Sequence, residues 1–167
     1  MPARRGVLRE GITVGLIGYA AVALFYSSFD FLASRGALYT VNLLGRALVR
    51  GLRDPSVLMF PLSPDWSAIF LYNVFHLIIA LAVGIFVTSI VAAAEENPAR
   101  RGMVRVIIVG GFFATIMVVA TLTTPIRPLI PMWSVIGANA LAAILAGAYL
   151  LRRRPGLWGR LALGATA

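Results

Sequence analysis

The chain has 167 residues, of which 60% are hydrophobic and 13% are charged, and its mean hydropathy is +0.90. This composition lies outside the range of soluble domains and predicts an all-α integral membrane protein. The absence of cysteine excludes disulfides, thiolate metal sites and cysteine nucleophiles. The net charge of +9 could suggest nucleic-acid binding, but in so apolar a chain arginines at helix ends fit membrane topology and anionic lipid headgroups better.

The first apolar run, residues 11–33, follows a short basic head and is expected to cross the membrane. It is too long for the apolar region of a signal peptide, so we predict that it is retained. One face carries small or polar residues at helical spacing, which favours close packing against a neighbouring helix: Gly15, Tyr19, Ala23, Ser27 and Asp30. We expect Asp30, near the end of this face, at the water interface, either solvated or capping the next segment. The alternative is a carboxylate that faces the interior of the helix bundle.

Residues 38–53 show the pattern of an amphipathic helix, with leucines on one side and a basic face on the other. The basic face holds Arg46, Arg50 and Arg53. Such a helix is expected to lie in the plane of the membrane interface, between the first and second spans. The alternative is that it docks on protein. The pattern does not separate lipid headgroups from an acidic protein surface as the contact of the basic face.

Residues 66–94 form the longest apolar run and contain the only histidine of the chain, His76. As a helix the run would measure roughly 40 Å, more than the ~30 Å hydrocarbon core of a bilayer, which predicts a second span. Tyr72 and Asn73 precede His76 in the first half of this span. The same face continues with residues that are typical of helix packing: Ala80, Gly84 and Thr88. We therefore expect His76 to face other helices or a partner and not lipid.

Two further spans are predicted, over residues 103–124 and 132–151. A short polar turn over residues 95–102, with two acids ahead of two arginines, precedes the third span and is expected to be solvated. The third span carries Thr121 on a face of small or polar residues, and the fourth span, rich in alanine and glycine, is interrupted by the polar Asn139. Three consecutive arginines end the fourth span, and the tail that follows is expected to rest on the membrane surface.

The distribution of charge predicts the orientation of the four spans. Ten arginines flank the spans on the side of both termini, and five lie on the opposite side. The positive-inside rule therefore predicts that both termini lie in the cytoplasm. We expect the membrane to be a bacterial inner membrane. In this topology polar residues of all four spans fall in the outer half of the membrane. They predict one intramembrane polar cluster of six residues: Asp30, Tyr72, Asn73, His76, Thr121 and Asn139.

Three roles are open for this cluster, because ionisable residues inside membranes are costly and are candidates for function. His76 could ligate haem iron or the magnesium of a chlorophyll, although one histidine cannot supply both ligands of a bis-histidine haem. It could instead form a proton or small-solute path with Asp30. The third role, which we favour, is a hydrogen bond from His76 to a neighbouring helix that holds the bundle or a subunit interface together.

No sequence pattern predicts catalysis or metal binding. The serines lack a nucleophile-elbow sequence, and the chain has no glycine-rich phosphate loop and no zinc-ligand spacing. We therefore expect a non-catalytic accessory or assembly subunit of a larger membrane complex, such as a respiratory or photosynthetic one. Its expected partners are the lipid bilayer and other membrane subunits, not nucleic acid. The alternatives are a cofactor-carrying redox or pigment subunit that uses His76, and a small transport component.

Overall fold

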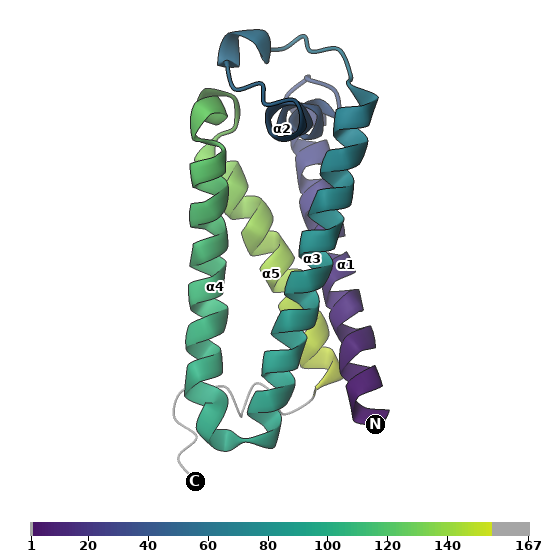
Figure 1. The fold of residues 1–167 in the computed structure, drawn as a ribbon, viewed down its shortest axis with the longest axis vertical. Helices are drawn as coiled ribbons and strands as arrows, with labels where there is room; N and C mark the ends of the chain where they lie inside the picture. The colour runs from purple at the N-terminus through teal and green to yellow at the C-terminus, as the bar shows by residue number, and fades with distance from the viewer. Residues whose placement is uncertain (1, 155–167) are drawn as a thin grey trace.

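The computed structural model describes residues 2–154, and within this range the chain is helical and contains no strand. Four helices are long and apolar enough to cross a membrane (Figure 1). They are α1 (Pro2–Leu32), α3 (Trp66–Glu96), α4 (Arg101–Leu122) and α5 (Met132–Arg153). The shorter α2 (Tyr39–Val49) lies between α1 and α3 in the chain. The connections hold three 3₁₀ turns: η1 (Pro55–Val57), η2 (Pro98–Arg100) and η3 (Thr124–Leu129).

The four long helices confirm the predicted apolar runs, and the limits differ most at α1 and α2. The basic head predicted before residue 11 is itself helical, because α1 begins at Pro2. The amphipathic helix ends at Val49 and not at residue 53, because Gly51 adopts a left-handed φ of 68° that breaks the helix. Arg53 therefore lies outside α2. The tail predicted to rest on the membrane surface lies outside the described residues.

Helices α1 and α3 run antiparallel and side by side (Figure 1). Their backbones are in direct contact along a seam of glycines. A Cβ atom at Gly84 would lie 2.5 Å from the backbone oxygen of Gly11, and one at Gly15 would lie 2.7 Å from the oxygen of Ala80. No side chain larger than hydrogen fits at these positions without moving a helix. Thr88, one turn beyond Gly84, is fully buried in the same seam. The predicted packing face of the second span is therefore confirmed.

At one end of the bundle, α2 packs across the neighbouring helices and loops of the same chain (Figure 1). Its Gly45 lies so close to α3 that a Cβ atom there would be 2.6 Å from the oxygen of Ala68. Its apolar side chains join a buried cluster with the loops and the start of α5: Tyr39, Leu43, Ala47, Leu58, Ile126, Ile130 and Val135. Docking on protein, which was the alternative for this helix, is thus realised within the chain. A location in the plane of a membrane interface stays a prediction.

Helix α4 is the least packed of the long helices. Val104 is its only buried residue. In Figure 1, α4 stands apart from α3 over most of its length, and α5 crosses obliquely between α4 and the α1–α3 pair. Helix α5 packs mainly on α1, although it follows α4 in the chain. The bundle therefore consists of a tight α1–α3–α5 unit and a more separate α4.

Candidate functional site

A cavity of about 90 Å³ lies between α1, α2 and α3, and it contains most of the polar residues that the sequence singled out. The α1 side is formed by Val22, Ala23, Tyr26, Ser27 and Asp30. Ala37, Leu38, Thr40, Val41 and Leu44 close it from the α1–α2 turn and from α2. The α3 side consists of Tyr72, Asn73 and His76. Four of the six predicted cluster residues therefore share one cavity.

Asp30 is buried at the edge of this cavity, with 1% of its surface exposed. Its carboxylate accepts hydrogen bonds from the backbone nitrogen and the hydroxyl of Thr40, at 2.6 and 2.7 Å, and from Arg35 at 3.2 Å. Asp30 thus neutralises Arg35 and holds the first turn of α2. The expectation of a solvated Asp30 is wrong, and the carboxylate faces the interior of the bundle, which was the alternative. It bonds to the first turn of α2, although the N-cap position itself is held by Leu38. The reversal of the chain at Ser34 and Gly36, both with positive φ, brings Thr40 back to the end of α1.

His76 lies against two tyrosine rings in the seam between α1 and α3. Its ring centroid is 5.2 Å from that of Tyr19 and 5.9 Å from that of Tyr72. The Tyr19 hydroxyl donates a hydrogen bond of 3.0 Å to Asn73, whose amide nitrogen donates to the backbone oxygen of Ile69. The inter-helix hydrogen bond that we expected from His76 is therefore formed by Tyr19 and Asn73 instead.

Three polar side chains on the cavity wall form no hydrogen bond with another residue of the described range: Ser27, Tyr72 and His76. Their neighbours are satisfied, because Asp30, Thr40 and Asn73 bond to one another or to the backbone. A polar group that leaves water without a partner costs about 1–3 kcal/mol. The groups without a partner therefore lie on two sides of the same cavity, Ser27 on α1 and Tyr72 and His76 on α3.

Thr121 and Asn139 do not belong to this site, and the prediction of a six-residue cluster is wrong for these two. The Thr121 hydroxyl donates to the oxygen of Met117 at 2.9 Å, and the Asn139 amide donates to the oxygen of Val135 at 2.8 Å. Each side chain is satisfied by its own helix. The prediction rests on a shared depth in the membrane, and depth does not determine which helices are neighbours.

The surroundings of His76 do not fit a haem or a chlorophyll. The cavity has a volume of about 90 Å³, whereas pockets for drug-sized ligands measure roughly 300–1,000 Å³. A macrocycle on His76 would have to separate α1 from α3, which touch through their backbones at Gly15 and Gly84. Within the described residues, no group of three histidine or carboxylate side chains is placed to hold a metal ion.

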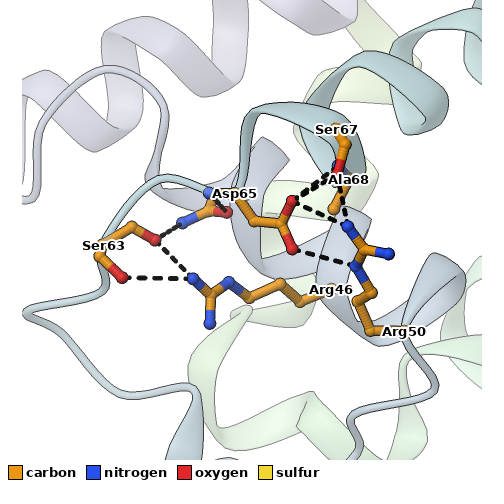
Figure 2. A network of polar contacts seen from close by, with 7 residues as sticks. Arg46, Arg50, Ser63, Asp65, Ser67 and Ala68 are labelled. Atoms are coloured by element: carbon orange, nitrogen blue, oxygen red, sulfur yellow. Dashed lines mark hydrogen bonds and ion pairs between the residues drawn. The ribbon is translucent and has the colours of Figure 1, made fainter.

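The predicted basic face of α2 is largely occupied within the chain (Figure 2). Arg46 donates to the backbone oxygen of Ser63 at 2.7 Å, and Arg50 donates to both carboxylate oxygens of Asp65 at 3.0 and 3.2 Å. Asp65 is also the N-cap of α3 and accepts from the nitrogen of Ala68 at 3.0 Å. The hydrogen bond from Arg50, together with those from Ala68 and Ser67, holds the pKa of Asp65 well below its usual range. Two of the three arginines therefore fix the start of α3.

A second charged cluster, which the sequence did not predict, lies at the opposite end of the bundle. Arg154 pairs with Glu10 of α1 at 2.6 Å and also with Glu95 of α3. Hydrogen bonding to Glu10 raises the pKa of Arg154. The expectation of a fully solvated turn is wrong for Glu95, whose side chain is 23% exposed. The predicted four-span topology already places Glu10, Glu95 and Arg154 at the same end of the bundle, and this shared location was the only indication of the cluster in the sequence.

Comparison with protein families, with curated proteins and with solved structures gave no match. The functional argument therefore rests on the geometry of the chain itself.

Proposed function

We propose that this chain is an integral membrane protein and a non-catalytic accessory subunit of a larger membrane complex, in which α4 packs against a helix of another subunit. The incomplete packing of α4 carries this proposal. Its Gly110 and Gly111 have no atom of another element within 4 Å of where a Cβ atom would stand. In membranes, small residues let helices approach closely and are enriched at helix–helix interfaces.

The polar bonds of α4 give independent support. Thr115 and Thr121 donate only to backbone oxygens of α4 itself. The four ion pairs of the described residues involve α1, α3, α5 or the segments that flank them, and none involves α4. A helix that is tied to its own chain by so few contacts leaves most of its surface for lipid or for a partner. The open space at Gly110 and Gly111 favours a partner helix over lipid, because small residues allow close helix approach.

The proposed orientation places both termini in the cytoplasm and the spans in a bacterial inner membrane. The imbalance of ten arginines against five supports this arrangement. The α2 end would then face the periplasm. Because the chain has no cysteine, single introduced cysteines can report the side of each loop without further changes. A cysteine at Arg53 should react with an impermeant thiol reagent from outside intact cells, and one at Arg100 should not.

The subunit role is tested by photo-cross-linking in native membranes. A photoreactive amino acid replaces Phe113 of α4, which is 63% exposed, and in the control it replaces Leu24 of α1, which is 67% exposed. We expect one defined protein adduct at Phe113 and lipid adducts at Leu24. Gly110→Leu should abolish the adduct at Phe113, because a bulky side chain blocks close helix approach. Lipid adducts alone at both positions, with a monomer after mild solubilisation, would contradict the proposal.

A further inference from the structure

We infer that the cavity beside His76 is an aqueous vestibule that opens at the α2 end of the bundle and holds a small cluster of water. A second, open depression of about 460 Å³ adjoins the cavity and is lined by Ser27, Ser28, Phe31, Leu32 and Ala37. Ser27 and Ala37 line both spaces. The inferred route runs from the surface at the end of α1 through these two spaces to the histidine.

The polar groups on the cavity wall point to water as the occupant. The hydroxyls of Ser27 and Tyr72 and the ring nitrogens of His76 lack a partner among the described residues, and all three residues line the same cavity. In a membrane, hydrocarbon cannot satisfy such groups, so each would carry its full desolvation cost. Water that bridges them removes this cost, and a buried water needs two to four polar partners. The site offers three side chains within one cavity.

Size and charge define the class of ligand. At about 30 Å³ of liquid volume per molecule, the cavity takes roughly three waters or one small solute of similar size. Among the described residues, Asp30 is the only carboxylate on its wall, and Arg35 neutralises that charge. The vestibule therefore suits water and small neutral hydrogen-bonding molecules, and it offers no free charge to hold an ion.

This inference rests on the proposed membrane placement and not on a partner for α4. The inference can be tested in the full chain. Because the sequence has no cysteine, a single introduced cysteine is the only thiol that can react. Ser27→Cys lies at the shared mouth. Leu24→Cys is the control, because Leu24 precedes it by three residues on α1 and is 67% exposed but does not line the cavity. Both variants are reconstituted in sealed vesicles and treated with a charged, impermeant thiol reagent from either side.

We expect Ser27→Cys to react at least about tenfold faster than Leu24→Cys, because a thiol in hydrocarbon rarely forms the reactive thiolate. The reaction should occur only from the side of α2. His76→Cys should react with silver ion, which is small enough to pass the mouth, and Ala37→Phe should slow that reaction by narrowing the mouth. Each variant should unfold in detergent at the melting temperature of the wild type, which verifies that it is folded.

Three outcomes would overturn the inference. Reaction of Ser27→Cys with a lipid-soluble maleimide but not with the charged reagent would show that lipid fills the depression. Silver labelling of His76→Cys that Ala37→Phe leaves unchanged would show that access to His76 does not pass this mouth. Equal labelling of Leu24→Cys and Ser27→Cys by the charged reagent would show that α1 is not in the bilayer, and this outcome alone also removes the proposed membrane placement. Loss of the Phe113 cross-link would leave the vestibule unaffected.

Discussion

Glycines occur both in the α1–α3 seam and on α4, but their surroundings differ in the two places. Glycines in the seam bring two backbones into contact, so that Gly15 and Gly84 have no room for a methyl group. Gly110 and Gly111 of α4 have open space at the same position. Small residues in an apolar helix thus mark a surface suited to close approach, but they do not say whether the approaching helix belongs to the same chain. The difference separates packing that is completed within this chain from packing that is left open.

Polar contacts follow the same division. Asp30 joins α1 to α2, Asp65 joins α2 to α3, and Arg154 joins α5 to α1 and α3. No ion pair of the described residues reaches α4. The seam is therefore fixed at both ends by buried or half-buried charges, whereas α4 contacts α3 and α5 without an ion pair among the described residues. Each of the following changes tests one side of this division.

The largest effect is expected from a bulky residue in the seam. Gly84→Leu forces α1 and α3 apart, because its Cβ atom alone would come within 2.5 Å of the Gly11 oxygen. We expect a loss in the free energy of unfolding of about 3 kcal/mol or more, the upper end of the cost of an overpacked core. The matched change Gly110→Leu on α4 should leave the stability of the isolated chain unchanged. Unfolding of the detergent-solubilised protein, followed by circular dichroism, measures both. Equal losses would show that α4 is packed as tightly as the seam.

Removal of the Asp30 carboxylate tests the α2 end of the seam. Asp30→Ala leaves the Thr40 nitrogen and Arg35 without their acceptor in a buried place, so we expect a loss of about 1–3 kcal/mol. Asp30→Asn keeps an acceptor for one of these donors and should cost less. The control is Asp54→Ala, which removes an exposed carboxylate that bonds only to Ser56. If Asp30→Ala and Asp54→Ala reduced the free energy of unfolding equally, Asp30 would be solvated, which is one of the two arrangements predicted for it at the interface.

The predictable part of the fold follows from apolar length and helical period. Runs long enough to cross a bilayer show where the four long helices lie, and small residues at helical spacing show which faces of α1 and α3 pack. The placement of Asn73 and His76 opposite the α1 face with Tyr19 follows from the same pattern, because both faces are recognisable before the helices are paired. One seam and one polar site were therefore within reach of the sequence.

The rest depends on contacts between residues far apart in the chain. Arg154 and Glu10 are separated by 144 residues in the sequence, and the charge pattern around neither residue predicts that they pair. Asp30 is buried because the turn at Ser34 and Gly36 folds α2 back over it, which helical period alone does not reveal. Thr121 carries the same signal of a polar residue on a small-residue face as Ser27 does. The structure alone shows that Ser27 lies beside the cavity, whereas Thr121 lies on α4, away from the seam.

Loss of the charged cluster at the opposite end should have a moderate effect. Arg154→Ala leaves the carboxylates of Glu10 and Glu95 close together without a cation, and all three side chains are 14–23% exposed. Because the remaining exposure screens the charges, we expect a loss of roughly 1–2 kcal/mol in the free energy of unfolding. Glu10→Gln in the same background should recover part of it, because one of the two repelling charges is removed. The melting temperature of the two variants, compared with that of Arg152→Ala, measures this contribution.

The smallest effect is expected at the Arg50–Asp65 pair, which lies at the exposed start of α3, and its pH dependence identifies it. The folded-state pKa of Asp65 lies below the unfolded value of about 3.9. A carboxylate of this kind stabilises the fold above its unfolded pKa, and the contribution is lost as the pH falls toward the folded pKa. Arg50→Ala should therefore lower the melting temperature slightly at pH 7, and the difference from wild type should shrink below about pH 4. Arg53→Ala, which removes a charge beyond the end of α2, should show no such trend. If the difference between Arg50→Ala and wild type were constant from pH 3 to pH 7, the pair would not form, and the basic face of α2 would again be open to lipid headgroups or to a partner.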